Sequence, residues 1–227
     1  MRDHPYASFI DRVNKPSQYL GGEQGVVRKP WGDVESRICL AFPDLYEIGM
    51  SHLGYKILYD IVNRSEGLLA ERAYAAWDDM EKELRAARQA LCSLESAHAL
   101  HEFDIVGFSL QFELTYTNVL QMLDLGGIPV RSADRGEHDP LVVAGGPTAT
   151  HAEPMSPFID AFLIGDGERK LPELMREWAA SGAEGVPRAE RLRRIAKLGG
   201  FYVPSLYRRS LCEDTQVWVV EPGDTDA

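Results

Sequence analysis

The sequence predicts an α/β protein with a doubly wound parallel sheet of five strands and extensions at both ends of the chain. Short apolar runs, several of them closed by glycine or proline, alternate with stretches whose apolar residues recur at helical spacing. Strands that alternate with helices in this way form parallel sheets with right-handed crossovers and helices on both faces. The elements along the chain follow this alternation.

The first half of the chain predicts two strand–helix units. Residues 37–42 (RICLAF) are a continuous apolar run, typical of a strand that is covered on both faces. Apolar residues at helical spacing then predict a helix over residues 54–67. Residues 71–76 (ERAYAA) are predicted as a short second strand, followed by a helix over residues 78–90 whose acidic start suits the helix dipole.

The second half continues the pattern. Residues 103–111 (FDIVGFSLQ) are the third predicted strand, and the helix after it includes residues 119–125 and stops at two glycines. Residues 140–144 and 159–164 are the fourth and fifth strands, and a fifth helix begins near Glu168. Five repeats result, with the link after the fourth strand left open. The pattern is that of a Rossmann-like or flavodoxin-like fold.

Three parts of the chain are expected. Residues 1–33, rich in proline, glycine and charge, are predicted to be an N-terminal arm with a short helix, and residues 34–184 the α/β domain. Residues 185–227 are predicted to hold a helix, followed by a hairpin or linker built from residues 201–210 and 215–222.

Composition excludes several classes of protein. A net charge of -11, from 35 acidic and 24 basic residues, argues against a nucleic-acid-binding surface. Neither a long apolar span nor a secretory signal is evident, so we expect a cytoplasmic protein without a membrane segment. Cys39, Cys92 and Cys212 are far apart in the sequence and are expected to be reduced thiols.

Ligands of such sheets bind beyond the carboxyl ends of the strands, which points to residues 43–54, 109–117, 145–153 and 165–168. Glycines in these loops lack a Cβ atom, so the backbone can approach a large, planar or phosphate-bearing ligand; a sharp turn without a ligand is the alternative. The candidate cofactor-binding residues are Met50, Ser51, His52, Gly54, Ser109, Gln111, Gly145, Gly146, Pro147, Thr148, Gly165, Gly167 and Glu168.

Two side chains in these loops have a chemistry of their own. Ser109 ends the third strand and can donate a hydrogen bond to a ligand, or it can cap the turn that follows. His52 could offer an imidazole nitrogen to a metal or act as a proton donor, and the alternative is a polar loop residue near a helix N-cap. The same two interpretations apply to His151.

Five segments together resemble the N-terminal region of a family of cobalamin-binding-domain radical SAM proteins: residues 42–63, 76–85, 107–130, 142–168 and 199–207. The resemblance implies a Rossmann-like cobalamin-binding domain, followed by a barrel whose CxxxCxxC cysteines hold an iron–sulfur cluster and bind S-adenosylmethionine. This sequence has no such triplet. It is therefore expected to be the front module of a longer enzyme, silent by itself, with the radical SAM domain of the same polypeptide as its partner.

Cobalamin domains of the methyltransferase and mutase type carry D-x-H-x-x-G, S-x-L and G-G motifs. Ser109 and the pair Gly145-Gly146 match the second and third motifs, but Gln111 replaces the leucine and the first motif is absent. The resemblance implies a corrinoid whose nucleotide tail lies along Ser109 and the two glycines, with His52 as the candidate cobalt ligand. A degenerate domain that docks or presents substrate without a corrinoid, and a flavodoxin-like domain that binds a flavin or nucleotide, are the alternatives.

Overall fold

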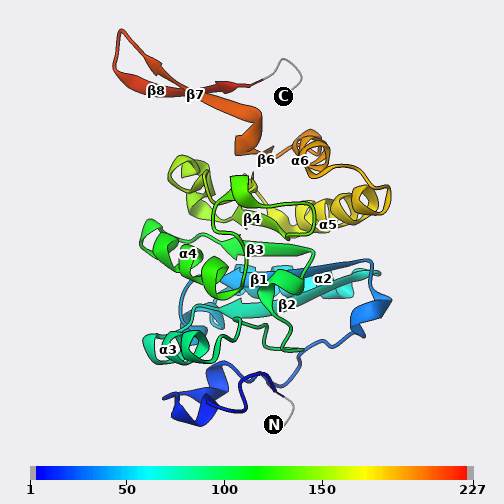
Figure 1. The fold of residues 1–227 in the computed structure, drawn as a ribbon. Helices are drawn as coiled ribbons and strands as arrows, with labels where there is room; N and C mark the ends of the chain where they lie inside the picture. Colours follow the sequence, from blue (N-terminus) through cyan, green and yellow to red (C-terminus); the bar gives the residue numbers. More distant parts are fainter. Residues whose placement is uncertain (1–3, 224–227) are drawn as a thin grey trace.

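The computed structural model describes residues 4–223 and has a central six-stranded sheet with the strand order β2-β1-β3-β4-β5-β6 (Figure 1). The first five strands pair in parallel, and β6 pairs with β5 in the antiparallel sense. The order 2-1-3-4-5 is that of doubly wound, flavodoxin-like sheets, so the predicted fold class is confirmed. The strands are β1 Ser36–Phe42, β2 Leu68–Tyr74, β3 Ile105–Ser109, β4 Leu141–Gly145, β5 Ala161–Leu163 and β6 Phe201–Tyr202.

Helices cover both faces of this sheet (Figure 1). One apolar cluster lies on each face of the sheet. Successive residues of β1 point to opposite faces, so Ile38 and Leu40 belong to one cluster and Cys39 and Ala41 to the other. The first cluster includes side chains of α2 and α5, and the second those of α3 and α4. The helices are α1 Tyr46–Gly49, α2 Leu53–Arg64, α3 Asp78–Ala87, α4 Tyr116–Leu125, α5 Gly167–Ala183 and α6 Arg188–Lys197.

The link between β4 and β5 differs from the other crossovers. It contains two 3-10 helices, Pro147–His151 and Glu153–Met155, at the position that the sequence pattern left open. Each has a proline in its first turn, and a proline has no backbone N–H to continue an α-helical ladder. The link that the sequence pattern left open is therefore built from 3-10 helices and has no α-helix.

Strand β2 begins at Leu68 and ends at Tyr74, earlier than the predicted residues 71–76. Two charged residues, Glu71 and Arg72, lie inside it and are nevertheless buried. The predicted strand included both of them and missed the apolar start of β2 at Leu68, Leu69 and Ala70. Charged residues are almost never fully buried unless they are paired. Their partners lie in segments distant in sequence, as described below.

β2 is also the edge of the sheet, and side chains close that edge. The Asn63 side chain accepts a hydrogen bond from the Ala70 N–H and donates one to the Ala70 carbonyl, each 3.0 Å long. Farther along, the Arg72 N–H donates to Glu95, and the Leu94 N–H donates to the Arg72 carbonyl. These bonds satisfy an edge that would otherwise be open to pairing with another strand.

The N-terminal arm, for which one short helix was predicted, has three 3-10 helices: Ile10–Arg12, Pro16–Gln18 and Trp31–Asp33. Tyr6 and Phe9 are almost completely buried and belong to the same apolar cluster as α3 and α4. The arm is thus packed as part of the core on that face.

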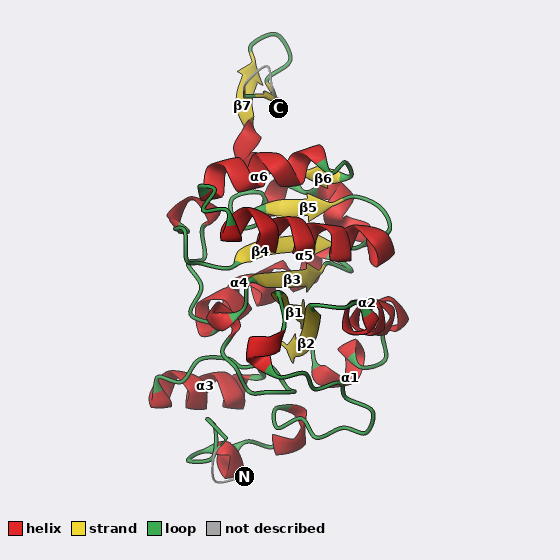
Figure 2. Ribbon diagram, turned by 90° about the vertical axis from the view of Figure 1, so that its right-hand side faces the viewer, coloured by secondary structure: helices red, strands yellow, loops and turns green. Residues whose placement is uncertain are grey.

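At the C-terminal end, the residues predicted to form a hairpin or linker contribute strands to two different sheets. Phe201–Tyr202 forms β6 of the central sheet, while β7 Tyr207–Cys212 and β8 Val217–Pro222 form a separate two-stranded hairpin. Figure 2 shows this hairpin standing beyond α6 and the rest of the fold. Among the described residues, no helix has the length and apolar character that crossing a bilayer requires.

Candidate functional site

A cleft of about 210 Å³ opens at the carboxyl ends of the central parallel strands, between α2 and α5. This is where ligands of doubly wound sheets bind. Eight of the thirteen predicted site residues line it: Gly54, Ser109, Gln111, Gly145, Gly146, Gly165, Gly167 and Glu168.

The walls of the cleft are mainly apolar side chains. Tyr55 and Leu58 come from α2, Leu171 from α5, Leu163 from β5 and Phe201 from β6. These residues were missed as site residues. At the level of sequence, an apolar helix position facing a cleft has the same spacing as one facing a filled core.

Backbone forms part of the cleft because three glycines contribute no side chain. Gly107, in the middle of β3, lines the cleft and was not predicted as a site residue. A Cβ atom on Gly145 would have no neighbour nearer than 3.8 Å, and one on Gly165 would have none within 4 Å. Space that side chains would otherwise fill is therefore open at the ends of β4 and β5.

Gly146 has a different reason to be glycine. Its φ angle is +110°, and a Cβ atom there would lie 2.6 Å from the Leu110 carbonyl oxygen. The close approach is made by the chain itself, so the turn interpretation accounts for this residue. The two adjacent glycines thus differ, with Gly145 leaving open space and Gly146 allowing a tight turn.

A chain of hydrogen bonds connects the cleft to the start of α2. Gln111 Nε2 donates to Ser109 Oγ at 3.0 Å, and Gln111 Oε1 lies 3.1 Å from His52 Nε2. His52 Nδ1 accepts the Tyr55 N–H at 3.2 Å and thereby caps α2. Since Nδ1 accepts, Nε2 carries the proton and donates to Gln111 in the neutral ring.

This arrangement decides what each side chain can offer. Within the described part of the chain, the hydroxyl hydrogen of Ser109 has no acceptor, so it can donate to a ligand in the cleft. Both ring nitrogens of His52 are engaged, and His52 itself does not line the cleft. Ligation of cobalt through Nε2 would require its bond to Gln111 to break.

The other predicted residues lie beside the cleft and do not line it. The Thr148 hydroxyl donates to the Leu110 carbonyl at 3.2 Å, and the Ser51 hydroxyl donates to the Glu47 carbonyl at 2.8 Å. Pro147 is in the first turn of a 3-10 helix, and Met50 contacts a buried arginine. His151 is exposed, and its Nδ1 lies 3.2 Å from Thr150 Oγ1.

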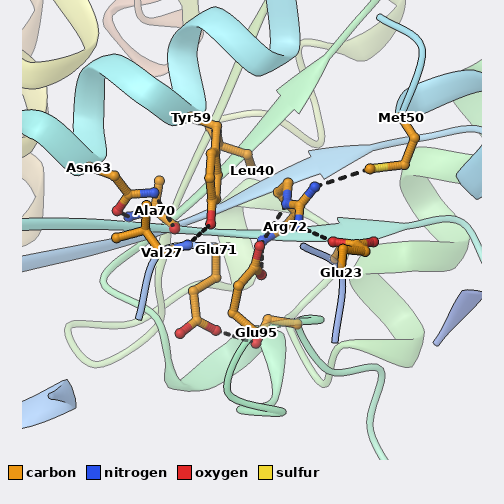
Figure 3. A network of polar contacts seen from close by, with 12 residues as sticks. Glu23, Val27, Leu40, Met50, Tyr59, Asn63, Ala70, Glu71, Arg72 and Glu95 are labelled. Carbon is orange, nitrogen blue, oxygen red and sulfur yellow. Dashed lines mark hydrogen bonds and ion pairs between the residues drawn. The ribbon is translucent and has the colours of Figure 1, made fainter. Parts of the chain in front are cut away.

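Figure 3 shows the buried arginine, Arg72, among partners from four segments of the chain. Its Nε donates to Glu95 at 2.6 Å, its Nη2 pairs with Glu23, and its Nη1 lies 3.0 Å from the Met50 sulfur. The guanidinium carbon of Arg72 lies over the Tyr59 ring, 4.8 Å from the ring centroid. Arg72 thereby joins the arm, the loop before α2, α2 itself and the turn at Glu95.

The electrostatics of this cluster follow from burial. Burial raises the pKa of Glu95, although Arg72 acts in the opposite direction. Burial and the hydrogen bond to Glu23 raise the pKa of Tyr46 to about 12. Loss of Arg72 would leave carboxylates that are costly to bury without a partner.

The start of α5 adds backbone donors at the rim of the cleft. Asp166, the N-cap residue, makes no side-chain capping bond, and Asp166, Gly167 and Glu168 all line the cleft. The first N–H groups of a helix have no partner within the helix, and its N-terminus carries partial positive charge. This end of α5 therefore offers backbone donors to a polar group of a ligand, next to the carboxylates of Asp166 and Glu168.

Large apolar side chains are exposed next to the lining residues. Leu53, Phe112 and Ile164 precede or follow a lining residue directly in the sequence, and they are 70%, 42% and 40% exposed. We call these three residues the apolar rim, because each adjoins the lining of the cleft and offers exposed apolar surface to a flat ligand or to another protein domain. Within residues 4–223, no group of three or more His, Cys, Asp or Glu is placed to hold a metal ion.

Comparison with known proteins gives one finding. A family model described as "Radical SAM proteins, N-terminal" matches residues 54–204, a segment that includes the cleft from Gly54 to Phe201. No curated protein and no solved structure matches the chain.

Proposed function

This chain belongs to the radical SAM proteins as an N-terminal region of that family, and from this we propose that it is the cobalamin-binding module of a radical SAM enzyme. The family implies S-adenosylmethionine and an iron–sulfur cluster in the complete enzyme. We propose that both lie in a radical SAM domain of the same polypeptide. The complete enzyme would transfer a methyl group or carry out a related radical modification.

The observation that carries this proposal is the open space where Gly145 and Gly165 lack side chains, beside the hydroxyl of Ser109. An apolar cavity of about 150 Å³ admits benzene, so a cleft of about 210 Å³ suits a larger heteroaromatic ring system. It is too small for a whole corrinoid, because pockets for drug-sized ligands run to about 300–1,000 Å³. The residues therefore fit the nucleotide tail of cobalamin, with the corrin ring outside.

Each part of the site would then have a defined task. The apolar walls of α2 and α5 would exclude water from the tail, and Ser109 would donate a hydrogen bond to it. The apolar rim at Leu53, Phe112 and Ile164 would pack on the corrin ring. Bound cobalamin would supply a cobalt-bound methyl group. The contribution of this chain is orientation, because it holds the cofactor in place toward the radical SAM domain.

Incubation of the purified chain with hydroxocobalamin, followed by gel filtration, tests the proposal. We expect the corrin absorbance to elute with the protein. Elution of colourless protein would favour the alternative of a degenerate domain that binds no corrinoid. Protein that is yellow as purified would instead indicate a flavin.

The role of His52 can be tested with the substitution His52→Asn. Asparagine is as good an N-cap as any residue, so α2 should remain capped and the urea midpoint should change little. Because Nε2 donates to Gln111, we expect the absorbance spectrum of bound hydroxocobalamin to be the same as with the parent protein. A shifted spectrum would assign His52 to the cobalt ion. His151→Asn is the matched control, since His151 is exposed and outside the cleft.

A further inference from the structure

The hairpin of β7 and β8 exposes apolar side chains along its length. All six residues of β8 are exposed, and Val217, Trp218 and Val220 have exposed fractions of 56%, 66% and 38%. On β7, Leu211 is 42% exposed. A two-stranded hairpin in water is marginally stable at best and needs further packing. This exposed surface is therefore a candidate for contact with another protein domain or another protein chain.

The register of the hairpin separates its two faces. Leu211 pairs with Trp218 and Arg209 pairs with Val220, so these four residues share one face with Tyr207. We call this the Trp218 face. The opposite face carries Cys212, Val217 and the pair Arg208–Glu221. The Trp218 face holds the two largest exposed apolar side chains of the hairpin.

The base of the hairpin is fixed to the body of the protein. Arg209 Nη2 donates to the Glu153 carbonyl at 2.9 Å, and the Tyr207 ring lies 5.0 Å from the Tyr202 ring. The Gly223 N–H donates to the Leu206 carbonyl at 2.7 Å. The contacts of Arg209 and Tyr207 involve the inner part of the Trp218 face. Figures 1 and 2 show the far end of the hairpin projecting from the body, and Leu211 and Trp218 pair near that end.

The inner part of the same face borders a groove in the body. The groove has a volume of about 720 Å³ and is lined by Tyr207 and Arg209 from the hairpin and by Arg188, Leu192 and Arg193 from α6. The exposed Trp218 face thus continues into a recess. A segment that covers Trp218 could extend into this groove.

We propose that the Trp218 face and this groove form the docking surface for the radical SAM domain of the same polypeptide. The family match ends at residue 204 and the hairpin begins at Tyr207, so the hairpin directly follows the N-terminal region. A radical SAM domain that follows the N-terminal region, as proposed above, would place the hairpin at the junction between the two. The inference rests on the part of the proposed function that places a radical SAM domain in this polypeptide, and not on corrinoid binding.

The small area of the Trp218 face favours this occupant over a second copy of the chain. Two paired strands of six residues are about 20 Å long and about 10 Å wide, so one face offers about 200 Å². Stable interfaces between separate proteins bury about 800 Å² on each partner. A smaller contact is sufficient within one polypeptide, where the linker keeps the effective concentration near the millimolar range.

Thiol labelling can test the proposal one face at a time. Cys212 lies on the opposite face and is partly exposed, while Cys39 and Cys92 are buried. The double substitution Leu211→Cys with Cys212→Ser moves the reactive thiol to the Trp218 face. Labelling rates of each protein with iodoacetamide are compared between residues 1–227 alone and the complete polypeptide. A hydrogen bond with Thr215 lowers the pKa of the Cys212 thiol, so the two positions would differ in reactivity even at equal exposure. Each thiol is therefore compared only with the same thiol in the other protein.

We expect the thiol at position 211 to react at least about tenfold more slowly in the complete polypeptide, and the thiol at Cys212 to change little. Adding Trp218→Asp to the position 211 variant should restore fast labelling. Equal rates at position 211 in both proteins would overturn the proposal. The proposal would also be overturned if, in residues 1–227 alone, the thiol at position 211 reacted more slowly as the protein concentration rose. That result would indicate that a second copy of the chain covers the Trp218 face. Retention of hydroxocobalamin by residues 1–227 is measured separately, so failure of either idea can be recognised.

Discussion

Replacing Arg72 with methionine is expected to lower the free energy of unfolding by about 3–5 kcal/mol, the range for breaking a buried ion pair from one side. The Arg72 side chain is 8% exposed and that of Glu95 is fully buried. Methionine fills similar space but leaves Glu95 and Glu23 without their cation. The loop at Met50 and the arm at Glu23 would lose their common partner. Urea unfolding followed by tryptophan fluorescence measures the change.

The loss in the Arg72→Met variant should become smaller as the pH falls. Burial already raises the pKa of Glu95, and removing Arg72 removes an influence that lowers it. A carboxyl whose pKa is higher in the folded than in the unfolded protein binds its proton more tightly when folded. Its burial is therefore most costly above the folded pKa, and this cost declines as the pH falls through that value. The deficit should be smaller at about pH 5 than at about pH 8.

Arg64→Met is the matched control for this experiment. Arg64 pairs with Asp60 at 3.0 Å on the surface of α2, and its side chain is 80% exposed. Exposed pairs contribute little to stability, so this variant should unfold at nearly the same urea concentration at both pH values. If Arg72→Met were as stable as the parent protein near neutral pH, the network would not be what holds the arm and the loop together.

Replacing Gly145 with valine is expected to weaken hydroxocobalamin binding by at least about 30-fold, which corresponds to about 2 kcal/mol. The first added carbon would be no nearer than 3.8 Å to its neighbours, so the strand can accept it. Valine also suits a β-strand. Its methyl groups would occupy space in the cleft where the nucleotide tail is proposed to lie. Titration of the corrin absorbance gives the affinity, and urea unfolding checks that the fold is retained.

Gly32→Val is the matched control, because a Cβ atom on Gly32 would have no neighbour within 4 Å and Gly32 lies outside the cleft. It should leave the affinity unchanged. Undiminished binding by a folded Gly145→Val variant would mean that the ligand does not enter this cleft. Weaker binding in both variants would point to a general effect on the protein.

The strands were predictable to the extent that their apolar runs were uninterrupted. Residues 37–42 all lie within β1, because an apolar run of that kind has to be covered on both faces of a sheet. The prediction for β2 overlapped the strand at residues 71–74 but missed its first three residues, and it gave no reason why Glu71 and Arg72 should be buried. Their burial depends on Ser93, Glu95 and Glu23, which no local pattern connects to β2.

The sequence predicted where the candidate site lies in the fold, but it did not predict which residues of each loop line the cleft. The rule that ligands lie beyond the carboxyl ends of parallel strands located the loops, and eight of the thirteen chosen residues line the cleft. The rule does not say which way each loop residue faces. Thr148 and Ser51 turn to nearby carbonyl groups, and Met50 turns to Arg72. Gly107 could have been found as a glycine inside a strand, which often marks a close approach.

The sequence by itself determined the alternation of strands and helices, and with it the edge of the sheet where a cleft would open. That information is local, because apolar periodicity and the glycines at strand ends are properties of neighbouring residues. Only the tertiary structure decided that Gly145 leaves open space while Gly146 makes room for Leu110, and that His52 caps α2 and donates to Gln111. These outcomes depend on distances between segments that are far apart in the chain and meet only when it folds.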